Sequence, residues 1–390
     1  MKYTKYISTL LISTCLIAGL TLHPQAASAQ NGTSFETNEG WGINVNGAIP
    51  VFLNLSAHDE FSADGEDQLA TRVMSGFNPA NVTFTVNAPT QDGINVSAVF
   101  QINYHLHGPS VQNAGLFEAR IADIVISGDF GTINAGKGFG IFNSISIGDE
   151  GSGMGIGRFG GPDAADATLG RIGSGYTYAN FNPRITYTTP DVGGFTAKVG
   201  LINPEKPGGP SPNTETAGPR IEGQIDYVFD LGRGSLQTWG GGLYQSVSIA
   251  DPDFDFNISG WDTGLKLNIA GLKLTGSYSE TKSIGADGLI GINISGGDAL
   301  DQADIDGAQW YTEATYDFGG LLLGASYGEG SQDANSTAVG SADDVTNELL
   351  MGFARYDITD NLTWIGEVQN FASEAQDDYQ ALILGLQLNF

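Results

Sequence analysis

Few residues after position 30 have the types and spacing that catalysis needs. The histidines there are His58, His105 and His107, and the chain's one cysteine is Cys15. On a strand, His105 and His107 would share one face and could bind a metal ion, but no cysteine or nearby carboxylate completes a ligand set. A polar strand face is the simpler interpretation of this pair.

Two further patterns could be read as ligand sites. The glycine alternations at 136–140 and 151–157 resemble nucleotide-binding loops, but no helical pattern follows to receive a phosphate. The acidic segments at 59–67 and 298–306 could hold Ca²⁺ or Mg²⁺ through carboxylate oxygens, or could be ordinary solvated loops. We therefore predict that the chain is not an enzyme and needs no cofactor, with a divalent ion at these acidic segments as the one alternative.

Charge and composition exclude several classes of protein. The 390 residues include 16 Lys and Arg against 44 Asp and Glu, a formal charge of -28. Such an acidic chain is a poor partner for nucleic acid, whose phosphates require a basic surface. Glycine is unusually frequent, with 56 residues, but it lacks the three-residue period of collagen. After residue 30 no apolar run reaches the roughly 18 residues of a membrane-spanning helix.

The first thirty residues have the order of a secretory signal peptide. Lys2 and Lys5 precede an apolar stretch at 6–20, and Ala27-Ser28-Ala29 forms a small-residue cleavage site. We predict cleavage after Ala29, which leaves a mature chain of residues 30–390; a membrane-anchoring helix is the alternative. The mature chain would have a formal charge of -30 and no cysteine, so disulfides would not stabilise it.

Alternation of apolar and polar residues is the strongest signal in the mature chain. At 94–107 the apolar face carries Ile94, Val96, Phe100 and Ile102, while asparagine, serine, glutamine and histidine occupy most of the other face. The final segment, 379–390, repeats the pattern with leucines and a terminal Phe390. A period of two over about ten residues predicts a strand with one dry face and one wet face.

Sixteen segments follow this pattern. They lie near 41–55, 72–87, 94–107, 118–128, 131–138, 183–189, 195–202, 220–229, 234–248, 259–269, 271–281, 308–317, 321–328, 347–356, 362–371 and 379–390. Short turns alternate with long acidic, glycine-rich connectors. An even number of strands with loops sorted in this way is typical of an outer-membrane barrel rather than a soluble sandwich.

Two segments do not keep a single parity. The second segment needs a bulge near Asn78 and Pro79, because its apolar residues change face there. In the fourth, simple alternation puts either Arg120 or Asp123 on the dry face.

The wet faces carry small or polar residues that would line water well, for example Thr186, Lys198, Glu222 and Glu313. Sixteen strands enclose an aqueous channel. The connector at 139–182 is far longer than the others, and we predict that it folds into the barrel; a surface loop is the alternative. The predicted fold is therefore all-β, a 16-stranded antiparallel transmembrane β-barrel with a long loop folded into the lumen.

Several local motifs resemble one known family. Residues 128–137 resemble the strand, turn and strand that precede the constriction loop of general, non-specific Gram-negative outer-membrane porins. Residues 184–190 with 193–195 resemble the strand pair after that loop, and terminal Phe390 resembles the assembly signal of outer-membrane proteins. The resemblance covers the whole mature chain in layout.

The resemblance implies a homotrimer in which basic wall residues face acidic residues of the loop at 139–182. The wall candidates that it implies are Arg72, Arg120, Lys137 and Arg184. The loop candidates are Asp149, Glu150, Asp163 and Asp166, each of which could instead be a solvated loop charge. Lys137 shares parity with Ile133 and Ala135, so its inward direction is not fixed by the pattern.

The resemblance and the wet strand faces together imply a passive diffusion channel for small hydrophilic solutes. The expected place is the outer membrane of a Gram-negative bacterium, with membrane lipid and lipopolysaccharide as partners. The acidic composition predicts weak cation selectivity. The alternatives are a substrate-specific channel, although few basic residues are available for an anion pathway, and a barrel that acts as an adhesin or an enzyme.

Overall fold

A computed structural model describes residues 32–37, 39–59, 68–104, 106, 117–159, 168–204, 214–216, 218–250, 253–285, 303, 305–334 and 343–390. The predicted signal peptide lies outside these residues. Within them, no helix is long and apolar enough to cross a bilayer.

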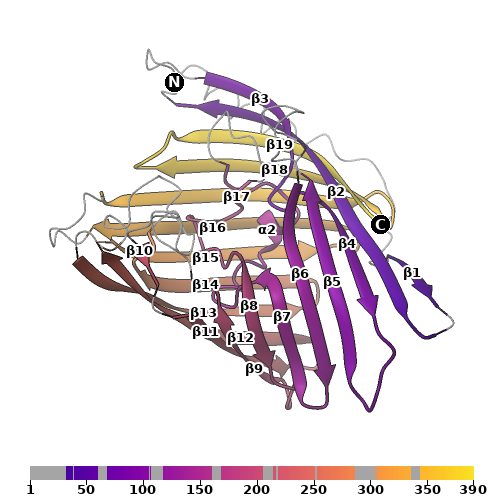
Figure 1. The fold of residues 1–390 in the computed structure, drawn as a ribbon. Coiled ribbons are helices and arrows are strands. Elements are labelled where there is room, and N and C mark those ends of the chain that lie inside the picture. Colours follow the sequence, from indigo (N-terminus) through magenta and orange to yellow (C-terminus); the bar gives the residue numbers. More distant parts are fainter. Residues whose placement is uncertain are drawn as a thin grey trace.

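The described strands form one closed antiparallel sheet (Figure 1). The strands are β1 (Thr33–Glu36), β2 (Gly42–His58), β3 (Gln68–Met74), β4 (Ala80–Asn87), β5 (Asn95–Tyr104), β6 (Phe117–Gly128), β7 (Gly131–Phe139), β8 (Phe181–Thr188), β9 (Phe195–Ile202), β10 (Thr214–Glu215), β11 (Arg220–Asp230), β12 (Gly234–Ala250), β13 (Asp253–Ile269), β14 (Leu272–Lys282), β15 (Ile305–Asp317), β16 (Leu321–Ala334), β17 (Val345–Asp357), β18 (Leu362–Ser373) and β19 (Tyr379–Asn389). The one described helix, α2, spans Glu150–Gly153.

The barrel has sixteen strands, as the sequence predicts. β1 is a short addition beside β2, and β10 a short addition beside β12. β3 and β4 both pair with β2 and act as two halves of one strand. The ring closes because β19 pairs with β2, with Leu384 opposite Leu53.

The two faces of the wall differ as the alternation predicts. Large apolar side chains stay exposed on the outer face, among them Ile185, Val199, Ile221 and Ile225. Their polar neighbours along the same strands point inward, and many are buried inside the barrel. This distribution suits a wall with lipid outside and a polar interior.

The predicted irregularity in the second strand is confirmed. Residues 75–79 interrupt the ladder between β3 and β4, and they turn toward the long connector at 139–182. The N–H of Phe77 donates to the carbonyl of Gly155 at 2.9 Å, and the Asn78 side chain donates to the carbonyl of Gly153 at 2.6 Å. The break in the strand is therefore a contact point between the wall and the long connector.

The expectation that Arg120 or Asp123 faces the dry side is wrong. The register of β5 and β6 shifts between Gln101 and Ile102, because Gln101 pairs with Ile121 and Ile102 pairs with Ala119. Arg120 is thus an extra residue in β6, and a bulge of this kind reverses the parity of the strand. Arg120 and Asp123 are both buried as a result.

Short turns connect neighbouring strands at one end of the barrel, and two of these turns share a local motif. The carboxylate of Asp230 accepts from the N–H of Gly232, and the carboxylate of Asp317 accepts from the N–H of Gly319, each at 2.7 Å. Such aspartate turns reverse the chain within a few residues. Both glycines have positive φ angles, which the absence of a side chain permits.

Candidate functional site

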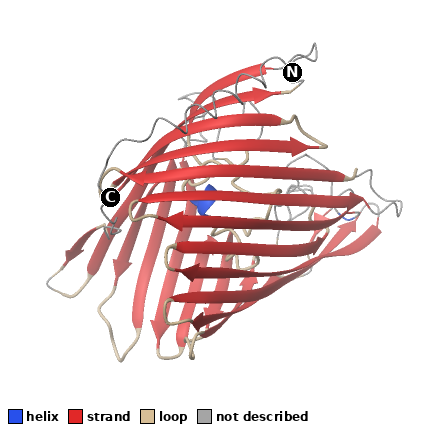
Figure 2. Ribbon diagram, turned by 180° about the vertical axis from the view of Figure 1, so that it is seen from behind, coloured by secondary structure: helices blue, strands red, loops and turns tan. Residues whose placement is uncertain are grey.

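The described parts of the long loop, residues 139–182, lie against the inner side of the wall. Helix α2 contacts β15, β16 and β17, and Figures 1 and 2 show it within the ring of strands. Lys266 on β13 donates to the carbonyls of Ile145 and Gly148, and Ser277 on β14 donates to the hydroxyl of Ser146. The loop thus follows the inner face of the second half of the barrel.

Apolar packing also joins the long loop to the wall. Phe52 on β2 and Met74 on β3 are buried in one cluster with Ile156 and Phe159 of the loop. Tyr311 on β15 packs with loop residues in a second cluster, and its hydroxyl donates to the carbonyl of Ser146 at 2.7 Å. Phe52 and Tyr311 share the parity of the polar residues on their strands, and both are buried inside the barrel.

Glu150, a predicted loop acid, is held by two basic residues of the wall it lies on. Its carboxylate oxygens are 2.6 Å from Lys273 Nζ and 2.8 Å from Arg355 Nη1. Partial burial acts to raise the pKa of Glu150, but the hydrogen bonds and charges of Lys273 and Arg355 outweigh it and lower that pKa. Glu150 is therefore ionised at neutral pH and paired.

Asp149, the second predicted loop acid, is buried within the loop. Its carboxylate accepts from the N–H and the hydroxyl of Ser152 at 2.9 and 2.6 Å, and it lies 3.8 Å from Arg171 Nε. Arg171 donates in turn to Ser326 and to the carbonyl of Leu349. Asp149 thus holds the shape of the loop, and it is 2% exposed.

Arg184 on β8 and Asp123 on β6 form an ion pair on the inner face. Arg184 Nη2 lies 2.9 Å from Asp123 Oδ2, and Asn134 on β7 donates to the same oxygen at 2.9 Å. On the neighbouring strands, Asp226 accepts from Thr196 and Gln237. This part of the wall carries paired charges of both signs.

Arg120, another predicted wall residue, is enclosed beside the loop. Its guanidinium lies 2.9 Å from the Glu118 carboxylate and 5.4 Å from the centre of the Phe181 ring. Tyr178 of the loop lies nearby, and burial raises the pKa of Tyr178 to about 12 although the charge of Arg120 acts to lower it. Arg120 is 9% exposed, which leaves little of it for contact with solutes.

The remaining predicted residues of the constriction differ in position. Arg72 lies on β3 opposite the buried Asn54, on the inner face. Lys137 shares the outer parity of Ile133 and Ala135, and its Nζ donates to the carbonyl of Ala119 at 2.7 Å. The structure therefore does not bring Lys137 to the inner wall. Asp163 and Asp166 lie outside the described residues.

These positions differ from an arrangement in which loop acids face wall cations across open space. Asp149 and Glu150 bond to residues that they lie against, and Arg120, Arg184, Lys273 and Arg355 each have a carboxylate beside them. The basic residues of the inner wall and loop are Arg72, Arg120, Arg158, Arg171, Arg184, Lys198, Arg220, Lys266, Lys273 and Arg355. The acidic residues that the structure describes there are Glu118, Asp123, Asp149, Glu150, Glu222, Asp226, Asp262, Glu313 and Glu367. Among the described residues the two charges nearly balance.

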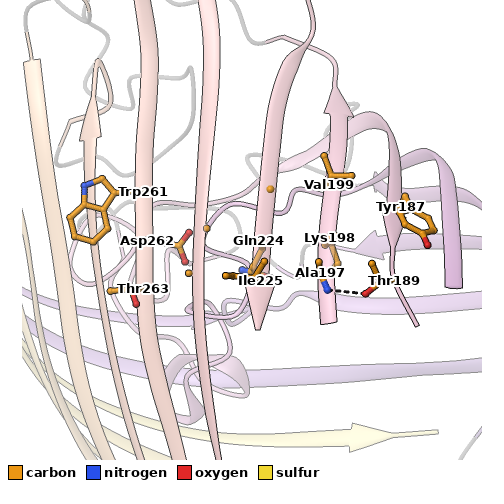
Figure 3. Close-up of a pocket in the computed structure, with 13 residues that line it drawn as sticks. Tyr187, Thr189, Ala197, Lys198, Val199, Gln224, Ile225, Trp261, Asp262 and Thr263 are labelled. Atoms are coloured by element: carbon orange, nitrogen blue, oxygen red, sulfur yellow. Dashed lines mark hydrogen bonds between the residues drawn. The ribbon is translucent and has the colours of Figure 1, made fainter. Parts of the chain in front are cut away.

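A groove of about 680 Å³ lies outside this interior, on the outer face of β8–β13. Figure 3 shows Trp261 and Tyr187 at opposite sides of the groove, with Val199 and Ile225 between them. Gly223 and Gly240 leave its floor without side chains. The groove is mostly apolar and faces the position of the membrane, so it is not part of a solute pathway. Among the residues described, no cluster of histidine, cysteine and carboxylate groups could hold a metal ion.

Solved structures with this fold are outer-membrane channels and porins. The channel DcaP of Acinetobacter baumannii has a TM-score of 0.69 at 15% identity, over 92% of this chain and 100% of that chain. OmpF of Salmonella typhi, in complex with daunomycin, has a TM-score of 0.62 at 15% identity, over 92% and 100%. An anion-selective porin from Comamonas acidovorans has a TM-score of 0.61 at 18% identity, over 90% and 100%. At such identities the similarity establishes the fold alone.

The family assignment comes from the sequence. No curated protein sequence matches the chain significantly. The profile of the family described as Gram-negative porin matches residues 13–376, which is most of the chain. With its closed barrel of sixteen strands and polar inner face, the chain belongs to the Gram-negative porin family and is an outer-membrane channel.

Proposed function

We propose that this protein is a passive diffusion channel for small hydrophilic solutes and ions, with a weak preference for cations. The observation that carries the proposal is the inner wall of β4–β9, whose polar side chains stay partly exposed inside a closed barrel. They include Thr83, Gln101, Asn134, Arg184 and Lys198. Groups of this kind can exchange hydrogen bonds with water and with passing solutes.

We propose that the long loop narrows this channel. Most described contacts of the loop are with strands between β11 and β19, with β2 and with the break after β3, so we infer that the remaining space lies mainly between the loop and β4–β9. Ile145, Ile147 and Tyr178 of the loop, each partly exposed, contribute apolar surface beside the polar wall. A narrow water column with one polar side would slow apolar solutes more than polar ones.

The cation preference rests on the mouths of the barrel rather than on its nearly balanced interior. The short turns carry exposed aspartates, and the opposite end carries further exposed acids. Those at the short turns are Asp92, Asp129, Asp191, Asp230, Asp317 and Asp360, and those at the other end include Asp59, Asp333, Asp343, Asp344 and Glu374. A ring of one sign at a low-dielectric mouth concentrates the opposite ion.

We also propose a homotrimer in a membrane that contains lipopolysaccharide. The outer face of β13–β16 carries Trp261, Tyr278, Trp310 and Tyr327, the aromatic residues expected where a barrel meets lipid head groups. The outer face of β2–β4 carries instead aliphatic residues such as Val51, Leu53 and Val73. This second face suits contact with another subunit. Cleavage after Ala29 and divalent ions at the acidic outer loops stay predictions.

Single-channel recording in a planar bilayer tests the proposal. Insertion of the detergent-extracted protein in KCl should give ohmic conductance steps in groups of three, and a salt gradient should give a reversal potential that favours potassium. A reversal potential that favours chloride would contradict the cation preference. A folded, heat-modifiable barrel that conducts no current would contradict the diffusion channel itself.

A further inference from the structure

Three glutamates of the inner wall each accept hydrogen bonds from two consecutive backbone N–H groups of the long loop. Glu313 on β15 is the clearest case, because one oxygen accepts from Glu150 at 2.7 Å and the other from Gly151 at 2.9 Å. Glu367 on β18 accepts from Ile156 at 3.0 Å and from Gly157 at 3.4 Å.

Glu222 on β11 makes the third such contact, at the start of the loop. Its Oε2 accepts from the N–H of Ile141 at 2.6 Å and from that of Phe142 at 3.0 Å. Its Oε1 lies 2.7 Å from Arg220 Nε, which keeps the carboxylate oriented. The exposures of the three glutamates are only 0 to 2%.

These contacts supply hydrogen-bond acceptors to backbone N–H groups of the loop that are buried inside the barrel. Buried backbone N–H groups need acceptors, and a loop has no neighbouring strand to supply them. A carboxylate is the strongest side-chain acceptor, and its two oxygens can receive two adjacent N–H groups. Other wall groups add single bonds, as Asn347 does by donating to the carbonyl of Gly173 at 3.1 Å.

The positions of the three glutamates define the path of the first half of the loop. They contact it at 141–142, at 150–151 and at 156–157. The glutamates lie on β11, β15 and β18. From β11 to β18 there are seven strand-to-strand steps round the sheet, roughly 34 Å at the usual strand spacing. The first half of the loop is thus fastened along an arc of the wall.

We propose that Glu222, Glu313 and Glu367 are positioning residues that hold the long loop against the wall and thereby set the size limit of the pore. The proposal rests on the diffusion function proposed above. A glutamine at these positions would keep the size of the side chain. It would offer one acceptor oxygen in place of two, and its amide NH₂ could not accept from the N–H groups of the loop.

The test compares two triple variants. E222Q/E313Q/E367Q removes the three loop contacts, and E280Q/E329Q/E348Q removes three charges from the outer parity of β14, β16 and β17 as a matched control. Both carry Gly153→Cys in the loop, where an added Cβ has no heavy atom within 4 Å. Because Cys15 lies in the predicted signal peptide, this cysteine can receive a single nitroxide label.

We expect the nitroxide spectrum of E222Q/E313Q/E367Q to show increased mobility, and we expect liposomes containing it to admit larger oligosaccharides. The control triple should match the Gly153→Cys single variant in both readouts. Equal label mobility and an unchanged sugar series in the two triples would overturn the proposal. If E222Q/E313Q/E367Q does not fold, E313Q alone is tested in the same way. A loosened label in a barrel that passes no sugar would support the loop contacts and overturn the pore function.

Discussion

Arg184 and Asp123 meet across a strand that has no side chain between them. Gly136 on β7 pairs with Asp123 of β6 on one side and with Arg184 of β8 on the other. The space above this glycine lets Arg184 Nη2 reach Asp123 Oδ2 at 2.9 Å. A Cβ added at Gly138, two residues along β7, would also contact the Arg184 guanidinium. The sequence of β7 therefore makes room for this ion pair.

Removal of the positive member of this pair should increase cation selectivity. In Arg184→Gln, Asp123 keeps its charge with only Asn134 as a partner, so the inner wall becomes more negative. One unit charge at about 10 Å in water changes the energy of a monovalent ion by about 0.4 kcal/mol, with opposite sign for potassium and chloride, which together correspond to roughly a fourfold rise in the potassium-to-chloride permeability ratio. Reversal potentials in a KCl gradient measure this ratio.

Lys137→Gln is the matched control for this experiment. It removes the same charge from the adjacent strand, but Lys137 has the outer parity and donates to the Ala119 carbonyl. The reversal potential should therefore stay close to that of the wild type. An equal shift in Lys137→Gln and Arg184→Gln would show that Lys137 does act in the lumen.

Removal of the Asp123 charge should decrease cation selectivity, and the double variant should restore it. Asp123→Asn leaves the Arg184 guanidinium with Thr186 as its other hydrogen-bond partner, which should move the reversal potential toward chloride. Asp123→Asn combined with Arg184→Gln should return the ratio to near the wild-type value, because the net charge is restored. Shifts of the same sign in the two single variants, or a double variant far from the wild-type ratio, would contradict this charge effect.

The fold could be predicted from the sequence because alternation is local. Each strand carries its own apolar and polar faces, so Ile185 and Thr186 could be assigned without knowledge of their neighbours. The break between β3 and β4 was also visible, since apolar parity changes near Pro79. The bulge at Arg120 was not, because it depends on the register with Gln101 of β5.

The candidate site was harder to predict from the sequence, because its residues come from distant parts of the chain. Glu222 and Glu313 could be placed on the wet face, but nothing local indicates that each meets a loop segment well over 70 residues away. Glu367 and the buried Arg171 carry no motif at all. Lys137 matched a family position by sequence, although its shared parity with Ile133 and Ala135 left its direction open.

Glu150 should stabilise the protein at neutral pH and lose that effect in acid. Its pKa in the folded protein lies below the ordinary value of 4.5 through Lys273 and Arg355, so its contribution is complete above that value. It disappears as the pH falls through the lowered pKa. We therefore expect Glu150→Gln to be less stable than the wild type at pH 7, with a difference that shrinks below about pH 4.5.

Urea unfolding of the two proteins at several pH values measures this difference. Glu329→Gln, on the outer parity of β16, is a suitable control for the loss of one carboxylate. A stability difference between wild type and Glu150→Gln that stays constant down to pH 3 would contradict the contribution of the Lys273 and Arg355 contacts.

Tyr311→Phe should weaken the contact between the wall and the long loop. The Tyr311 hydroxyl donates to the carbonyl of Ser146, and both residues are buried. The phenylalanine ring would keep the packing but would leave that carbonyl without this donor, which typically costs about 1 to 3 kcal/mol. Tyr316→Phe is the control on the same strand, because Tyr316 is 42% exposed on the outer face. Urea titration followed by tryptophan fluorescence should show a lower midpoint for Tyr311→Phe than for Tyr316→Phe. Equal midpoints would mean that the hydroxyl contributes nothing to holding the loop.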